Sequence, residues 1–213
     1  MSAPPLQERE RADARRNRER ILCAARQLID CQGLDAVSMD DVAAAAGVGK
    51  GTLYRRFGDR SSLLRALIEE PEREFQESLI RGEPPLGPGA PPEERLHAFG
   101  EGLLGFLNGH APFIQAADSM SSGKRYLHPV YAFYRTHVWL LLRQSLGDLP
   151  TTEYLADCLM GPLGAEPYLH QHLARGMSHD EICSGWHALA DAVLGRSHAR
   201  DAGDADRREP SAA

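Results

Sequence analysis

Basic and hydrogen-bonding side chains occupy one short segment near the N-terminus. Lys50, Thr52, Tyr54, Arg55 and Arg56 fall within seven residues, and the apolar spacing predicts a short helix over residues 50–57 with these side chains facing solvent. Ammonium, guanidinium and hydroxyl groups bind phosphates, and a helix of this size fits the major groove of DNA. The pattern indicates nucleic-acid binding. It leaves open whether Arg55 or Arg56 pairs with guanine or holds a phosphate.

The residues before this segment predict a second short helix, joined to it by a tight turn. Ser38 starts that helix three residues before Asp41, close to a capping box, and Asp40 and Asp41 suit its first turn. Gly47 tolerates the backbone angles of a turn, and the small Ala43 lets the two helices approach. The result is a helix-turn-helix; the alternative is an ordinary helical hairpin with a charged outer face. Its small apolar core is expected to contain Val42, Ala46, Val48 and Leu53.

Helical periodicity extends along the chain, and the expected fold class is all-α. An apolar stripe that ends at Gly33 predicts the first helix, Ser61 is the expected cap of the fourth, and Pro71 should kink or end that fourth helix. Residues 82–92 are rich in proline and glycine and predict a loop. Further helices are expected over residues 93–107, 112–120, 126–146, from residue 152 to interruptions at Pro162 and Pro167, and after a capping box at Ser178–Glu181.

Composition limits the other classes of protein. The 213 residues carry 24 Lys+Arg and 30 Asp+Glu, a net charge of −6, but the charge is uneven. Residues 1–60 hold 11 basic and 9 acidic residues, whereas the remainder holds 13 and 21. The sequence contains no long apolar run and no signal-peptide core, so we expect a cytoplasmic protein without a membrane span. Four scattered cysteines without a CxxC pair favour reduced thiols.

The stretch Ile21–Leu67, which contains VAAAAGVGKGTLYRRF and then RSSLL, resembles the DNA-binding domain of TetR/AcrR-family transcriptional regulators. The resemblance implies a homodimeric repressor of a palindromic double-stranded DNA operator, released by a small-molecule effector. It also implies a three-helix helix-turn-helix domain over residues 1–62, with a flexible arm at 1–14. A larger helical effector-binding and dimerisation domain would cover residues 63–196. Residues 197–213 lack Leu, Ile, Val and aromatic residues and are predicted to be disordered.

The resemblance also assigns DNA contacts. The family's usual contact positions are occupied here by Lys50, Gly51, Thr52 and Tyr54. Ser38 begins helix 2, and Arg60 stands where a phosphate-binding lysine is frequent. Gly49 departs from the family's usual Ser or Thr, and Pro71 is a second departure. A glycine cap costs only a few tenths of a kcal/mol, so the helix should form. The expected DNA-binding set is Ser38, Met39, Gly49, Lys50, Gly51, Thr52, Tyr54, Arg55, Arg56 and Arg60.

Aromatic residues after the proline-rich loop are the candidates for an effector pocket. Aromatics at helical spacing are more often plain core. Their abundance and the scarcity of charges weakly favour an apolar or aromatic effector. Trp186, Leu189, Ala190 and Val193 suit a dimer interface in the last helix, or equally the protomer core. The candidate pocket residues are Phe99, Phe106, Phe113, Tyr131, Tyr134, His137, Trp139 and Tyr154.

Three alternatives remain beside this interpretation. A metal- or redox-responsive regulator is suggested by His170, His172, His179 and Cys183, although His170 and His172 point apart on a helix. A DNA-binding protein without an effector is a second alternative. An enzyme is not expected, because no phosphate-binding glycine loop and no nucleophile motif occurs in the sequence. No cofactor and no metal are expected.

Overall fold

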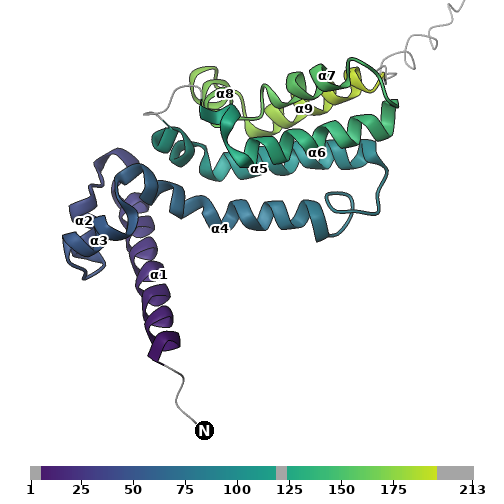
Figure 1. Ribbon diagram of the computed structural model, residues 1–213. Helices are drawn as coiled ribbons and strands as arrows, with labels where there is room; N and C mark the ends of the chain where they lie inside the picture. The colour runs from purple at the N-terminus through teal and green to yellow at the C-terminus, as the bar shows by residue number, and fades with distance from the viewer. Residues whose placement is uncertain (1–5, 119–123, 196–213) are drawn as a thin grey trace, which may run out of the picture. The chain divides into compact units, whose positions relative to one another are not determined.

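The computed structural model describes residues 6–118 and 124–195, and all regular elements in these two ranges are helical (Figure 1). The predicted all-α class is confirmed. Within the same ranges, no helix combines the length and the hydropathy needed to cross a membrane. The predicted tail, residues 197–213, lies outside the described residues. The α-helices are α1 (Leu6–Gln32), α2 (Met39–Ala45), α3 (Lys50–Phe57), α4 (Arg60–Arg81), α5 (Pro92–Asp118), α6 (Pro129–Leu146), α7 (Thr152–Met160), α8 (Ala165–Leu169) and α9 (His179–Val193).

Short helical turns complete the element order. A 3-10 turn, η1 (Leu34–Ala36), joins α1 to α2, and η2 (Lys124–Leu127) precedes α6. A π-helical turn, η3 (His170–Ala174), follows α8 directly. The expected loop is confirmed, because α4 ends at Arg81 and α5 begins at Pro92. The expected interruption at Pro162 is confirmed, since α7 ends at Met160. The expected interruption at Pro167 is wrong, because Pro167 is the third residue of α8, in the first turn of a helix, where proline is tolerated.

The described residues form two compact units. The first comprises those of Met1–Gln76 and Phe106–His128, and the second those of Glu77–Gly105 and Pro129–Ala213. Both α4 and α5 therefore contribute residues to each unit. This division differs from the expected boundary between residues 62 and 63, because compactness follows contacts between distant segments that a linear pattern does not reveal.

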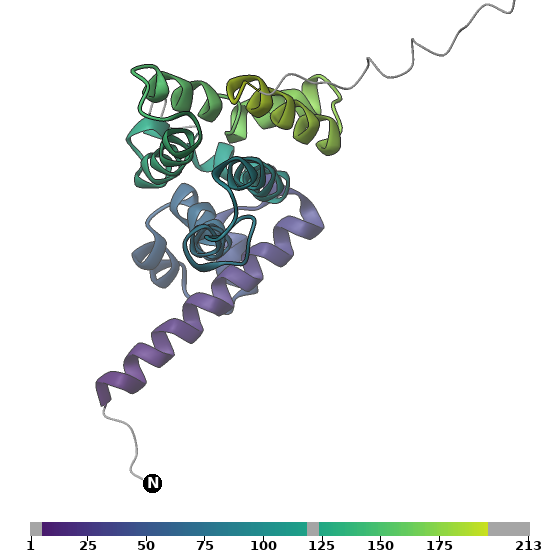
Figure 2. The ribbon, with the colours of Figure 1, turned by 90° about the vertical axis from the view of Figure 1, so that its right-hand side faces the viewer.

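The core of the first unit is built from α1 to α4 and the end of α5. Ile21, Ala25, Leu53 and Leu64 are at most 2% exposed in this core. Helix α1 begins at Leu6, so residues 6–14 are helical where a flexible arm was expected. Figures 1 and 2 both show these first turns of α1 extending beyond α2 and α3. Ion pairs at helical spacing, such as Arg15 to Glu19 at 3.1 Å, favour this extension.

Helix caps follow the expectations in two places and differ in a third. Capping boxes are present at Ser38 with Asp41 and at Ser178 with Glu181, as predicted. At α4, however, the side chain of Asp59 accepts the backbone N–H of Ser62 at 2.7 Å. Asp59 and not Ser61 therefore caps the fourth helix. Aspartate is as good a cap as serine, and Asp59 stands three residues before Ser62, the spacing at which a cap accepts a backbone N–H.

Prolines inside two helices were the main source of error in the expected helix ends. Helix α4 continues through Pro71 to Arg81. Helix α5 continues through Pro112, although two separate helices were expected there. A proline removes one backbone hydrogen bond from a helix. Burial of apolar side chains before and after the proline offsets this loss. In α5, Leu103 belongs to the second unit and Phe113 to the first, and both are buried.

Helices α6, α7 and α9 form much of the second unit. Arg135 on α6 donates to Asp157 at 2.5 Å and to Glu153 at 2.6 Å on α7. The indole N–H of Trp186 on α9 donates to the carbonyl of His97 at 3.2 Å. The buried residues of α6 are Tyr134, Val138, Leu141 and Leu142. A helix was expected from residue 126, but α6 begins only at Pro129, and Leu127 before it is 83% exposed.

Candidate nucleic-acid interface

The α2–turn–α3 motif is held by a backbone turn and a small apolar core. Gly47 has a φ of 61°, in the left-handed region that favours glycine. The N–H of Val48 bonds to the carbonyl of Ala43 at 3.0 Å, which closes the turn against α2. Leu53 and Phe57 are the buried residues of α3. The remaining positions of α3 must therefore face away from the core.

The expected DNA-facing residues of α3 are brought together on that outer face. Tyr54 is 47% exposed, Arg55 and Arg56 are exposed, and Thr52 is half-buried. Neither Arg55 nor Arg56 forms a side-chain hydrogen bond or ion pair with another residue of the described ranges. Two guanidinium groups and a phenol are thus presented within one turn of helix, and such groups bind phosphates and base edges.

Lys50 lies at the first position of α3 and is paired within the protein. Its ammonium group forms an ion pair with the carboxylate of Asp40 on α2. Hydrogen bonding to Asp40 raises the pKa of Lys50 above its ordinary value. Sequence reasoning assigned Asp40 only to the start of α2. The proximity of Asp40 to Lys50 depends on how the turn brings α2 and α3 together. The only signal in the sequence was an acidic residue ten positions before Lys50.

Gly49 precedes α3 without a side-chain cap. The expected loss of a capping hydroxyl is therefore real, yet the helix forms. The carbonyl of Gly49 accepts the N–H groups of Thr52 at 2.9 Å and of Leu53 at 3.2 Å, and these bonds start the helix without a cap. Ser38 is exposed at the start of α2, where hydrogen bonds from its hydroxyl and backbone lower the pKa of Asp41.

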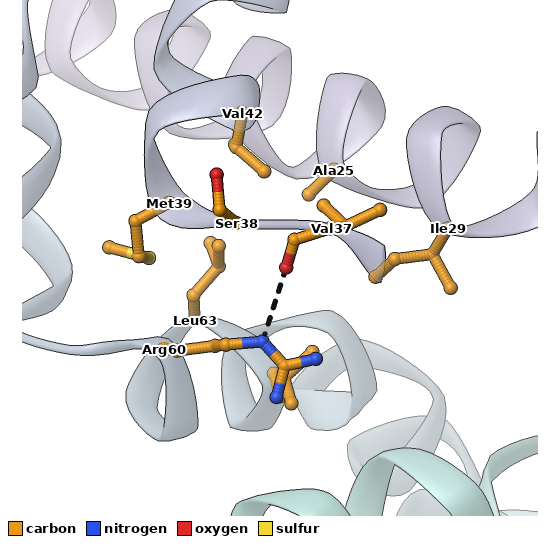
Figure 3. Close-up of a pocket in the computed structure, with 9 residues that line it drawn as sticks. Ala25, Ile29, Val37, Ser38, Met39, Val42, Arg60 and Leu63 are labelled. Atoms are coloured by element: carbon orange, nitrogen blue, oxygen red, sulfur yellow. Dashed lines mark hydrogen bonds between the residues drawn. The ribbon is translucent and has the colours of Figure 1, made fainter. Parts of the chain in front are cut away.

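Met39 and Arg60 were expected to contact DNA, but the structure uses both side chains inside the fold. Met39 is only 6% exposed. The guanidinium of Arg60 donates to the carbonyl of Leu34 at 2.6 Å and to that of Val37 at 3.3 Å. Figure 3 shows Arg60 reaching the Val37 carbonyl beside a small apolar cavity, which Met39 also lines. Met39 lies inward because its position on α2 faces the core, and Arg60 lies inward because two carbonyl groups accept its N–H groups.

The candidate effector residues are divided between the two units. Phe99, Tyr134 and His137 meet in the second unit, where the ring of Phe99 lies 5.8 Å from Tyr134 and 5.4 Å from His137. Phe113 instead packs in the core of the first unit under the guanidinium of Arg26. These placements follow from α5 continuing through Pro112.

The other candidates lie outside the Phe99 cluster. Phe106 belongs to the first unit and stacks on Phe75. Tyr131 and Trp139 are half-buried on α6. Tyr154 was expected to line a pocket, but its side chain is 72% exposed on α7. The buried residues of α7 are Thr152, Ala156, Leu159 and Met160, and Tyr154 lies about 200° around the helix from Thr152, on the opposite face.

His137 is the most distinctive polar group of the second unit. Its Nε2 atom is buried and has no hydrogen-bond partner among the described residues. Burial lowers the pKa of His137 to about 4, and the positive charge of Arg95 contributes. The hydroxyl of Thr152, on a residue only 1% exposed, is also buried without a partner in the described ranges. Such groups are rare and mark positions where a polar contact is missing.

The side chains of the histidine and cysteine cluster interact in separate pairs. His179 Nε2 lies 3.5 Å from Cys183 Sγ, and its Nδ1 lies 3.3 Å from the hydroxyl of Tyr168. His172 is directed elsewhere and contacts the carbonyl of Met177 at 2.8 Å. Burial raises the pKa of the Cys183 thiol, which disfavours the thiolate that binds metals and reacts with oxidants. In the parts of the chain that are described, no three ligating side chains converge.

Comparison with known proteins shows a similarity in the segment that contains this interface. Residues 21–67 match the family model of bacterial regulatory proteins of the tetR family. An HTH-type transcriptional regulator of Staphylococcus aureus (strain USA300) is 44% identical over 59 residues, which are 28% of this chain and 32% of that protein. The chain thus aligns with about a third of the length of the curated relatives that it matches.

Solved structures extend the similarity of the fold. A TetR-family regulator from Rhodococcus sp. is 20% identical, with a TM-score of 0.60 over 84% of this chain and 99% of that one. The TetR-family repressor FadR of Thermus thermophilus, solved in complex with lauroyl-CoA, is 15% identical. Its TM-score is 0.58 over 92% of this chain and 100% of that one. The matched segment contains the helix-turn-helix and the exposed outer face of α3, so this part of the chain is similar to the DNA-binding domain of tetR-family regulators, and the described fold is similar to theirs over most of the chain.

Proposed function

We propose that this protein is a homodimeric repressor that binds a palindromic operator through α3 and is released by a small effector. The observation that carries the proposal is the outer face of α3, where Arg55 and Arg56 have no side-chain partner among the described residues and Tyr54 is exposed. A helix with this face would enter the major groove, and two copies would read half-sites one DNA turn apart, about 34–36 Å, or a multiple of it.

The contacts proposed for the operator complex follow from exposure. Thr52, Tyr54 and Lys50 would bind phosphates, as would Ser38 and the backbone near Gly49 and Gly51. Arg55 and Arg56 would either read guanine or hold phosphates. Met39 and Arg60 would act through the fold and not by direct side-chain contact, because the structure directs both inward.

The effector proposed for the second unit is a small apolar or aromatic molecule. Support comes from the cluster of Phe99, Tyr134 and His137, in which apolar rings surround one imidazole nitrogen without a partner. An effector that hydrogen-bonds to His137 would remove the cost of this buried group. The acyl chain of lauroyl-CoA in the FadR complex is an apolar ligand on a similar fold. Release would follow if the effector prefers a conformer with wrongly spaced recognition helices.

A DNA-binding measurement tests the central proposal. Fluorescence anisotropy of the full chain is measured with DNA from upstream of its own gene and with an unrelated duplex of equal length. The wild type should bind the upstream DNA more tightly than the Lys50→Ala, Tyr54→Ala double variant, by tenfold or more, because each lost contact weakens binding. Binding should fall steeply with salt, since phosphate contacts release counterions.

The outcome that contradicts DNA binding is equal affinity of the wild type and the double variant at every salt concentration. The effector is tested separately, by screening apolar and aromatic compounds for a rise in melting temperature with loss of operator binding. Operator binding without any responsive compound, in both the wild type and a His137→Phe variant, would favour an effector-independent regulator. Sedimentation equilibrium would show whether the chain is a dimer.

A further inference from the structure

Lys50, the one lysine of α3, is paired with an acidic side chain that would compete with DNA phosphates for its ammonium group. Lys50 forms an ion pair with Asp40, and the two side chains are 67% and 51% exposed. Both therefore lie at the surface where DNA would approach. Asp40 is the second residue of α2, and Lys50 is the first of α3. The ion pair connects the starts of the two helices of the motif.

The capping box of α2 does not require Asp40. Ser38 exchanges hydrogen bonds with Asp41, whose carboxylate accepts the Ser38 N–H at 3.0 Å while the Ser38 hydroxyl accepts the Asp41 N–H at 3.2 Å. Asp41 is thus committed to the backbone. Asp40 is not, and its carboxylate is available to Lys50 alone among the interactions described for it. The capping box therefore does not explain the residue, and its charge in the first turn of α2 leaves the carboxylate free to pair with Lys50.

The negative charge of Asp40 repels any phosphate that approaches Lys50. A phosphate oxygen must displace the Asp40 carboxylate from the ammonium, or else approach with the carboxylate still nearby. The Debye length at physiological salt is about 8 Å, which exceeds the reach of an ion pair, so salt screens this repulsion only in part. A charge at the rim of an interface typically changes the rate of association and the dependence of binding on salt.

We propose that Asp40 limits the affinity of the protein for DNA by holding Lys50 until a phosphate replaces it. The proposal rests on the proposed DNA-binding function. Because a phosphate contact carries no sequence information, the effect applies to the operator and to unrelated DNA alike. Removal of the Asp40 charge would strengthen both and would add about one phosphate contact to the salt dependence.

The test compares Asp40→Asn with a matched control, Asp35→Asn. Asp35 is an exposed residue of η1, and its loss changes the net charge equally. Affinities of the full chain are measured on the upstream duplex and on an unrelated duplex between 50 and 200 mM salt, roughly the range in which phosphate contacts dominate. For Asp40→Asn we expect binding about threefold to tenfold tighter on both, and a slope of log K against log salt steeper by about 0.9. Asp35→Asn should change affinity less than about twofold, because it is not paired with Lys50.

A double-mutant cycle shows whether Asp40 acts through Lys50. In the Lys50→Ala background, Asp40→Asn should give no more gain than Asp35→Asn gives. An Asp40→Asn variant that binds no more tightly than Asp35→Asn, or that gains equally without Lys50, would overturn the proposal. Wild-type binding to upstream DNA that matches the Lys50→Ala, Tyr54→Ala variant would instead contradict the proposed function.

A measurement without DNA tests the ion pair itself. NMR titration of the Lys50 side chain should show a higher pKa in the wild type than in Asp40→Asn, because the carboxylate favours the charged ammonium. Equal pKa values in the two proteins would also overturn the proposal, whatever the DNA measurements show.

Discussion

The indole of Trp186 occupies the space that a side chain on Gly100 would need. A Cβ atom built on Gly100 would lie 1.8 Å from Cε2 of Trp186, far inside van der Waals contact. The same indole donates to the carbonyl of His97, one turn earlier on α5. Absence of a side chain at residue 100 therefore lets α9 pack directly on the backbone of α5 in the second unit.

Gly100→Ala should destabilise the second unit. Because the added methyl group overlaps Trp186, α9 must shift and lose its hydrogen bond to His97. Overpacking of this kind costs about 1–3 kcal/mol. Gly105→Ala on the same helix is the matched control, since its Cβ would meet nothing within 4 Å. Alanine there should be neutral or stabilising by up to about 1 kcal/mol. Urea denaturation measures both, and equal stabilities would contradict the described packing of α9.

Ser38→Ala should lower both stability and DNA affinity. The loss of its cap on α2 costs about 1 kcal/mol, and the proposed phosphate contact is lost as well. Ser178→Ala removes the corresponding capping box from α9, in which Glu181 takes the place of Asp41, and serves as the control. It should lower stability by a similar amount without weakening DNA binding. Thermal denaturation and anisotropy measure the two effects. An equal loss of affinity in both variants would mean that Ser38 acts only through stability.

Features that depend on neighbouring residues were predicted from the sequence better than features that depend on contacts between distant segments. Both capping boxes were found from four-residue patterns, because a cap depends on its own turn. The inward placement of Arg60 depends on carbonyls at Leu34 and Val37, more than 20 residues earlier, and no local pattern indicates them. The sequence pattern located the helix over residues 50–57 correctly, but it gave no sign that Asp40 would meet Lys50.

Tertiary packing also explains where the helix ends were mispredicted. Proline is a strong local signal against a helix interior, yet Pro112 lies inside α5. Burial of Leu103 and Phe113 on either side outweighs the one lost backbone bond. As a result Phe113 belongs to the first unit, and an effector role inferred from its position after the loop has little support. For the same reason, aromatic residues alone did not distinguish the Phe99 cluster from exposed Tyr154.

Arg60→Ala should weaken DNA binding through the fold. Its guanidinium donates to the carbonyls of Leu34 and Val37, so its loss leaves two part-buried acceptors without this partner and costs about 1 kcal/mol in stability. Affinity should fall while the salt slope stays unchanged. Arg56→Ala should do the opposite, with unchanged stability and a slope smaller by about 0.9 if it holds a phosphate. A reduced slope for Arg60→Ala would show that Arg60 contacts DNA directly, as the resemblance implies.

His137 should make the protein less stable as the pH falls from about 6.5 to 4. In the folded protein the pKa of His137 is about 4, whereas an unfolded histidine has a pKa near 6.5. Between these values the unfolded chain binds a proton that the folded chain does not, so acid favours unfolding by about 1 kcal/mol per pH unit. His137→Phe removes this proton and should flatten the pH dependence of the free energy of unfolding in that window. His170→Gln, at an exposed position, controls for the loss of one histidine. Urea titrations at several pH values decide the matter: an unchanged slope in His137→Phe would mean that this imidazole is protonated in the folded state or exposed to water.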